Sequence, residues 1–288
     1  MAIKLSKGVI YMIYASFTFA LMNVLVKYLS HIPAVELVFF RSLVSFIICV
    51  ALLKYQNIPL FGNKKKYLIS RGFFGMISLL LYFYTLQKIP LAAAATLQLV
   101  SPVFTAILGY YFLSEKLHPW QVLFLTLSLT GTIVMKSFDA RIETLTLLAG
   151  LTSALASAFA YISIRKTGTS EHPLVIVLYF PMIATPISGV LSYNVWIMPE
   201  GFDWLLVIGV GVLTQIAQFY MTKAYQIEVA NKVASVNYIG IVFAFLFGYF
   251  IFGEMLNIQV ILGIALVLLG VMLNLNLGRI RLWISKMK

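Results

Sequence analysis

The sequence predicts an all-α membrane protein of ten transmembrane helices, arranged as two inverted repeats of five helices each. Three observations support this prediction: an apolar composition, ten apolar segments of membrane-spanning length, and one stretch that occurs twice. The chain has 288 residues, of which 61% are hydrophobic and 10% are charged. A soluble domain carries about 25% charged residues. A chain so poor in charge is typical of an integral membrane protein.

Ten segments are long and apolar enough to cross a bilayer, which takes about 20 residues. Turn residues and charges separate them, beginning with His31-Ile32-Pro33 and ending with the turn from Glu254 to Asn257. Ten such spans use about 200 residues, so we expect no soluble catalytic or receptor domain. In chain order the predicted spans are approximately 8–29, 34–54, 67–87, 91–113, 119–136, 145–165, 174–194, 204–225, 230–252 and 257–276.

One stretch, Thr85 to Met135, occurs a second time as Ala224 to Asn274, 139 residues later (254 − 115, from the two glutamates of the motif below). Twelve pairs are identical without a gap, and the block Gly-Tyr-x-x-x-x-Glu-x-Leu occurs in both copies. This block predicts two apolar helices joined by a tight acidic turn, made twice. Paired halves of this kind are a mark of secondary transporters, whose substrate site lies near the membrane midplane between the halves.

The repeat divides the chain into a first half, residues 1–140, and a second half, residues 141–288. Five spans per half is an odd number, so the second half must enter the membrane from the opposite side. Fourteen Lys and Arg residues fall on one side of the predicted spans and four on the other. Positive charge favours the cytoplasmic side. We therefore expect a multi-pass protein of the plasma (inner) membrane with both termini in the cytoplasm.

Other functional classes lack support in the sequence. The net charge of +12 is dispersed among short loops, which argues against nucleic acid as a partner. Cys49 is the only cysteine, so an intrachain disulfide is excluded. The three histidines are scattered without metal-ligand spacing, and no Walker motif is present. We therefore expect neither a cofactor nor a metal.

These residues also carry a family resemblance. The chain resembles the drug/metabolite transporter superfamily, in particular its ten-helix EamA-type permeases, in its five-plus-five layout, the turns Gly109–Glu115 and Gly248–Glu254, Pro102, and Phe40-Arg41. The resemblance implies that spans one, three, four, six, eight and nine surround a central cavity. It also implies a substrate such as an amino acid, nucleoside, nucleobase, S-adenosylmethionine, sugar or drug. The chain departs from the family at Ile241, where a proline is usual.

Polar side chains inside the spans are the candidate substrate ligands, because a polar group in a span usually faces a cavity or a partner. Gln98 and Asn237 occupy equivalent positions of the two copies, and an amide both donates and accepts hydrogen bonds. The alternative for each is a structural role, since amides also hold packed helices together. The further candidates in the surrounding spans are Asn23, Tyr82, Tyr161, Gln215 and Gln218.

Three charged residues have structural and functional interpretations. Glu115 and Glu254 lie in the repeated turns, where we expect each carboxylate to accept backbone N–H groups and hold the turn; proton coupling is the alternative. Arg41 lies about two helical turns into its span. We expect Arg41 to bind backbone carbonyls or Glu36, and the alternative is contact with an anion.

The function expected from the repeat and the resemblance is alternating-access transport of small organic metabolites, with export of amino acids preferred. Nucleobase-type or nucleoside-type solutes such as S-adenosylmethionine are the alternative substrates. The expected partners are the small-molecule substrate and the lipid bilayer, with a proton or another coupling ion as an open alternative. A membrane-embedded lipid enzyme would need a clustered constellation of His, Asp or Ser, which the sequence lacks. A structural subunit of a larger complex is the third alternative.

Overall fold

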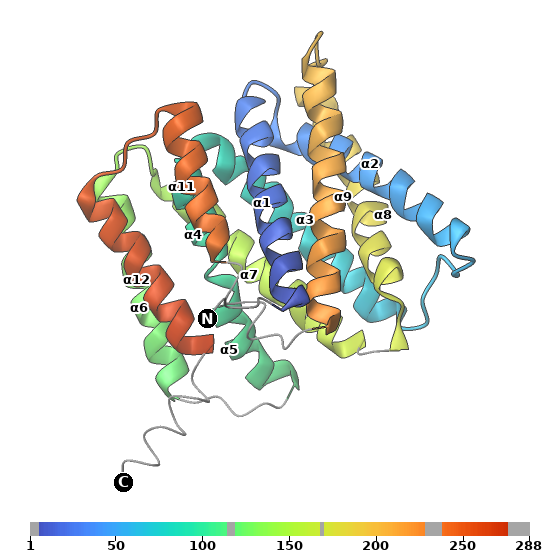
Figure 1. Ribbon diagram of the computed structural model, residues 1–288, viewed down its shortest axis with the longest axis horizontal. Coiled ribbons are helices and arrows are strands. Elements are labelled where there is room, and N and C mark those ends of the chain that lie inside the picture. The colour runs from blue at the N-terminus through green and yellow to red at the C-terminus, as the bar shows by residue number, and fades with distance from the viewer. Residues whose placement is uncertain (1–5, 114–118, 168–169, 228–237, 276–288) are drawn as a thin grey trace.

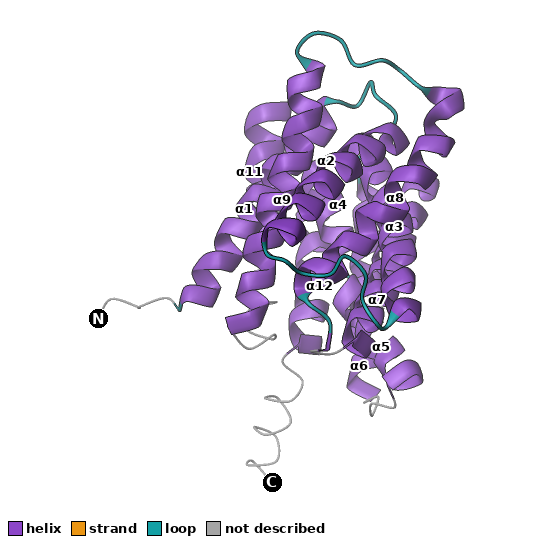
Figure 2. Ribbon diagram, turned by 90° about the vertical axis from the view of Figure 1, so that its right-hand side faces the viewer, coloured by secondary structure: helices purple, strands orange, loops and turns teal. Residues whose placement is uncertain are grey.

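The computed structural model describes residues 6–113, 119–167, 170–227 and 238–275, and helices form every regular element in these ranges (Figures 1 and 2). The helices pack side by side in one bundle. The helices are α1 (Lys7–Tyr28), α2 (Ala34–Tyr55), α3 (Lys65–Lys88), α4 (Leu91–Gln98), α5 (Ser101–Leu113), α6 (Pro119–Phe138), α7 (Thr144–Thr167), α8 (Pro173–Ser192), the 3₁₀ turn η2 (Tyr193–Val195), α9 (Asp203–Ile227), α11 (Ile239–Phe252) and α12 (Ile258–Leu275).

The described helices account for all ten predicted spans. Seven segments of the described chain are long and apolar enough to cross a membrane, one of them formed by α4 and α5 together. Three further apolar helices are shorter and belong to α6, α11 and α12. The ninth span, predicted over 230–252, is described from residue 238 onward. The protein is therefore an all-α polytopic membrane protein.

The fourth span departs from the prediction of one continuous helix, because it breaks between α4 and α5 at Leu99 and Val100. Pro102 explains the break. Its nitrogen has no hydrogen to donate to the carbonyl of Gln98, and its ring disfavours helical geometry at the preceding residue. At the break, backbone hydrogen bonds connect residues three apart instead of four: Leu99 N donates to Thr96 O and Val100 N donates to Leu97 O, both at 3.1 Å. Gln98 consequently ends α4 at the break.

The helix contacts follow a two-fold pattern between the halves. The repeat pairs α1 with α7, α2 with α8, α3 with α9, and α6 with α12. In the structure α1 packs against α9, and its counterpart α7 packs against α3. Likewise, the contact of α2 with α9 has its counterpart in the contact of α8 with α3. Two further contacts join a helix to its own counterpart: α2 packs against α8, and α6 packs against α12. Figure 1 shows the α6–α12 pair side by side at one edge of the bundle. The division at residues 140 and 141 itself stays a prediction from the sequence.

The short helix α4 lies at the centre of the main hydrophobic core. Its small residues Ala92, Ala93 and Ala94 are almost completely buried. Gly150 of α7 lets that helix approach closely, since a methyl group added there would lie 2.6 Å from a side-chain carbon of Leu97. Close packing through small residues is typical of membrane helices. It holds the end of α4, and with it Gln98, in the middle of the bundle.

Candidate substrate-binding site

A cavity of about 250 Å³ lies inside the bundle and is lined by eight helices. The first half contributes residues of α1, α2, α3 and α4, including Leu99 at the break that follows α4, and the second half contributes residues of α7, α8, α9 and α11. All six spans expected around a central cavity line it, and α2 and α8 add one residue each, Arg41 and Phe180. The volume suits a small metabolite, since pockets for larger ligands measure about 300–1,000 Å³.

Of the seven candidate substrate ligands, five line this cavity, one lies elsewhere, and one falls outside the described residues. Gln215 is buried elsewhere, where its amide nitrogen lies 3.4 Å from the sulfur of Cys49. Asn237 lies outside the described residues, although Gly240 and Ile241, just after it, line the cavity. The candidates that line it are Asn23, Tyr82, Gln98, Tyr161 and Gln218.

Gln98 is held by serines of α7, which favours a structural role for part of its amide. Its nitrogen donates to the hydroxyl of Ser157 at 2.6 Å, and its oxygen accepts from the hydroxyl of Ser153 at 2.9 Å. Ser78 of α3 bonds both serines, at 2.6 Å and 3.3 Å. We call these four residues the serine–glutamine cluster; it ties α3, α4 and α7 together. A primary amide has two N–H donors, and among the described residues Gln98 donates only to Ser157, which leaves one N–H for a molecule in the cavity.

Asn23 and Tyr82 form a second polar pair on the cavity wall. The amide nitrogen of Asn23 donates to the Tyr82 hydroxyl oxygen at 3.0 Å. The amide oxygen of Asn23 is buried and accepts no hydrogen bond from any residue of the described chain. The Tyr82 hydroxyl keeps its own hydrogen to donate. The pair therefore offers a ligand one acceptor and one donor.

Two arginines also reach the cavity, Arg41 from α2 and Arg71 from α3. The expected partner of Arg41 was a carbonyl or Glu36, but its Nε donates to the hydroxyl of Thr214 at 3.0 Å. Glu36 instead accepts from the backbone nitrogen of Ile197 at 2.9 Å. Arg71 was not among the candidate site residues, because a cation near the inner end of a span is typical of a topology signal. Gly75, one turn later on the same helix, was the available signal, because its missing side chain leaves room for a guanidinium.

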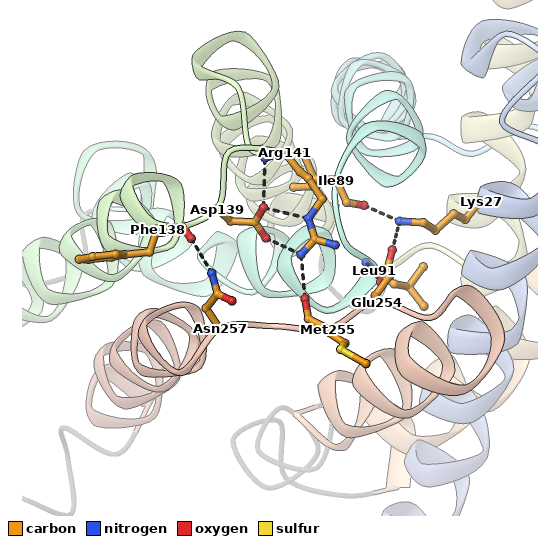
Figure 3. Close-up of polar contacts among 9 residues, drawn as sticks. All are labelled: Lys27, Ile89, Leu91, Phe138, Asp139, Arg141, Glu254, Met255 and Asn257. Atoms are coloured by element: carbon orange, nitrogen blue, oxygen red, sulfur yellow. Dashed lines mark hydrogen bonds and ion pairs between the residues drawn. The ribbon is translucent and has the colours of Figure 1, made fainter.

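Glu254 connects the two halves at one end of the bundle (Figure 3). One carboxylate oxygen forms an ion pair with Lys27 of α1, and the other accepts from the backbone nitrogen of Leu91 at 2.8 Å. Lys27 also donates to the carbonyl of Ile89 at 2.6 Å. We call Lys27, Ile89, Leu91 and Glu254 the latch. The carboxylate thus accepts a backbone N–H as predicted, but from the opposite half instead of its own turn. Its counterpart Glu115 lies outside the described residues.

The repeated glycine of the motif explains how Glu254 reaches the latch. A methyl group added at Gly248 would lie 2.5 Å from the Glu254 carboxylate, so the carboxylate folds back over a helix position without a side chain. Gly253 takes the left-handed conformation, with φ of 63°, which a glycine adopts at no steric cost. The spacing Gly-x-x-x-x-x-Glu is therefore the local requirement for this contact.

A second group of polar contacts lies beside the latch and involves the connection between the two halves (Figure 3). Arg141 binds Asp139 through two nitrogen–oxygen contacts of 2.9 Å and 2.7 Å and donates to the carbonyl of Met255 at 3.0 Å. The Arg141 hydrogen bonds lower the pKa of the Asp139 carboxyl. Asn257 donates to the carbonyl of Phe138 at 3.1 Å. These contacts hold the turn that contains Glu254 against the connection between α6 and α7.

A helical bundle with a polar cavity between two related halves defines the class of membrane transporters. The family comparison is specific: the EamA-like transporter family matches the chain twice, over residues 6–137 and 144–276. The chain therefore belongs to this family, within the drug/metabolite transporter superfamily. The family consists of transporters, so the chain is a transporter and not an enzyme.

Individual relatives cover most of the chain. The pseudopaline exporter CntI of Pseudomonas aeruginosa is 34% identical over 270 residues, which cover 92% of this chain and 95% of that protein. An S-adenosylmethionine uptake transporter of Rickettsia prowazekii is 27% identical over 258 residues, covering 86% and 85%. A solved crystal structure, 18% identical, superposes with a TM-score of 0.65 over 96% of this chain and 97% of that one, which shows the shared fold.

Proposed function

We propose that the protein is a secondary transporter that exports small organic metabolites, such as amino acids, across the plasma membrane by alternating access. The cavity carries this proposal, because both halves line it and a relative motion of the halves would open it to either side. Export as the direction is supported by the similarity to the pseudopaline exporter.

The latch supports alternating access. It joins α1 and the start of α4 in the first half to the turn before α12 in the second half. Closing one end of the bundle with a polar contact between halves leaves the other end as the route to the cavity. Such a contact must break in each transport cycle, which suits an ion pair and two hydrogen bonds better than a wide apolar interface.

Amino-acid-like solutes fit the cavity better than the alternative substrates do. Asn23 and Tyr82 offer an acceptor and a donor, and the two arginines favour a carboxylate. S-adenosylmethionine, the substrate named for the Rickettsia prowazekii relative, carries a sulfonium cation next to its amino-acid part. We expect the arginines to disfavour that cation, so we place this solute second.

Vesicles that contain only this protein test the proposal. We expect saturable flux of radiolabelled amino acids, with S-adenosylmethionine in a parallel assay. Gly240→Phe should abolish the flux by filling the cavity, since a methyl group at Gly240 meets only the Ser16 Cβ, at 3.9 Å. Val190→Phe is the matched control, because Val190 is 77% exposed on α8. The absence of saturable flux for every solute would refute the proposal, as would full activity of Gly240→Phe.

A further inference from the structure

Two cationic side chains converge on the cavity from opposite ends of the bundle. Arg41 lies seven residues after the start of α2 and Arg71 six residues after the start of α3, each about 10 Å along its helix. Consecutive spans cross the bundle in opposite directions, so the two helices start at opposite ends. Both guanidinium groups nevertheless lie against one ring, that of Phe180 on α8, at 5.1 Å and 5.4 Å from its centroid.

Arg71 points inward instead of toward the nearer end of its span. A cation six residues into a span usually extends its side chain back to the membrane interface. Here the Arg71 guanidinium lies over Gly75, one turn deeper, where an added methyl group would be 2.5 Å from its Nη1. The Nε of Arg71 is buried and has no hydrogen-bond partner in the described chain. Packing has thus placed a charge where the membrane makes it costly.

Arg41 is likewise a buried cation with an unsatisfied donor. It is 5% exposed, and its Nη1 has no hydrogen-bond partner among the described residues, although its Nε donates to Thr214. Its guanidinium also lies 5.8 Å from the ring centroid of Phe83. Aromatic faces stabilise a cation, but by less than burying an ion costs. The remaining cost calls for an anion.

The described part of the protein does not supply that anion. The cavity lining over these residues includes neither Asp nor Glu. The described acids with assigned contacts bind elsewhere: Glu36 to the Ile197 nitrogen, Asp139 to Arg141, Glu171 to the nitrogens of Asn63 and Lys64, Asp203 to His31, and Glu254 to Lys27. Two arginines beside one ring with no carboxylate between them form a ready anion site.

We propose that Arg41 and Arg71 together bind a carboxylate of the transported molecule, with Phe180 as the platform that aligns both guanidinium groups. This inference rests on the proposed transport function and names its substrate class: small organic anions that carry at least one carboxylate. A planar guanidinium matches a carboxylate through paired N–H donors. The Asn23 oxygen and the Tyr82 hydroxyl then receive the polar remainder of the same molecule.

A series of equal-sized ligands tests the charge requirement without any mutation. Glutarate, glutaramate and glutaramide share one carbon chain and carry two, one and no carboxylates. We expect the rise in melting temperature of the purified full-length protein to be largest with glutarate, smaller with glutaramate and smallest with glutaramide, because a ligand stabilises the state that it binds. Equal shifts for glutarate and glutaramide, or no shift with any carboxylate of the series, would overturn the proposal.

Variants locate the site. Arg41→Gln and Arg71→Gln should each weaken glutarate binding by at least about tenfold, since each removes charge-assisted hydrogen bonds. Gly75→Ala should weaken it as well, because it displaces the Arg71 guanidinium while the charge remains. Lys88→Gln, at the exposed end of the same helix, is the matched control and should bind normally. Normal glutarate affinity in the two arginine variants contradicts the proposal.

The flux assay separates this proposal from the transport proposal. Flux of a solute that is unaffected by Arg41→Gln and Arg71→Gln would refute the anion site and leave transport standing. Carboxylate-dependent stabilisation that requires both arginines, without flux of any bound carboxylate, would support the anion site and refute transport.

Discussion

Ser128 of α6 donates a hydrogen bond to the carbonyl oxygen of Val267 of α12 at 3.4 Å, and the two residues occupy the same position of the two repeats. A contact between equivalent positions lies on the axis that relates the halves. The neighbouring contacts agree: Gly131 approaches Gly263 and Val267, whereas its counterpart Gly270 approaches Phe124 and Ser128. Gly263 and Phe124 are again 139 residues apart, as are Val267 and Ser128. The α6–α12 interface is therefore one place where the two halves meet symmetrically, and neither helix contributes any of its described residues to the cavity lining.

The first prediction concerns this interface. Gly131→Ala should lower the melting temperature, because its methyl group would lie 2.6 Å from the carbonyl oxygen of Gly263 and 2.8 Å from the nitrogen of Val267. Overpacking of this kind costs about 1–3 kcal/mol. Gly240→Ala is the control, with no contact closer than 3.9 Å; it should be neutral or stabilising, since alanine favours helix by about 1 kcal/mol. Equal melting temperatures of the two variants would contradict the tight contact.

Most of the fold could be predicted because its signals are local. Span length, turn residues and an offset of 139 residues identify ten spans whose described ends agree with the helices to within a few residues. The fourth span differs only by its internal break, and the start of the ninth lies outside the described residues. The break in the fourth span depended on Pro102, whose effect on a helix is known, but the prediction extended the apolar segment through it. The sequence does not show which serines contact Gln98 at the break, because that depends on how α7 packs against α4.

The latch gives the second prediction. Glu254→Gln keeps an acceptor for the Leu91 nitrogen but leaves Lys27 without its counter-charge, and removing one partner of a buried ion pair costs about 3–5 kcal/mol. We expect a lower melting temperature or yield, and a similar loss for Gly248→Ala, which displaces the carboxylate. Asp203→Asn, whose partner His31 is half exposed, should change stability by less than about 1 kcal/mol.

Proton coupling is the alternative for the same residue. If Glu254→Gln folds with unchanged stability while the pH dependence of transport disappears, coupling replaces the latch as its role. Glu115→Gln, in the equivalent turn, belongs in the same experiment. A structural role predicts that this substitution too lowers stability or yield more than it changes substrate choice.

The third prediction is the topology. Both termini should lie in the cytoplasm, because the loops on that side carry most of the Lys and Arg residues. Reporter fusions after Lys288 and within residues 139–143 should therefore give signals from opposite sides of the membrane. A signal from the outer side at Lys288 would reverse the orientation and place the latch at the cytoplasmic end.

The site was less predictable than the fold, for a physical reason. Asn23, Tyr82 and Gln218 could be identified because a polar side chain in an apolar span is rare. Gln215 satisfied the same rule yet contacts Cys49, since sequence alone does not show which face of a helix meets the cavity. Arg71 satisfied a competing rule, because a cation near the inner end of a span also indicates topology. Only the convergence of Arg71 and Arg41 on Phe180, three helices brought together by packing, distinguishes a cavity cation from a topology signal.

The last prediction separates binding from packing at Gln98. Gln98→Ala removes both the bonds to Ser153 and Ser157 and the N–H left for the cavity. Ser153→Ala disrupts the same cluster from a buried position that does not line the cavity. Both variants should melt at a lower temperature, since a buried polar group left without its partner costs about 1–3 kcal/mol.

Only Gln98→Ala should also weaken substrate affinity, by roughly twofold to tenfold, the worth of one neutral hydrogen bond. Asn237→Ala, at the equivalent position of the second half, should weaken it by a similar factor. The measurement is the half-saturation concentration of transport beside the melting temperature of each variant. If Gln98→Ala and Ser153→Ala lower the melting temperature equally and both keep normal affinity, Gln98 only joins helices and does not touch the substrate.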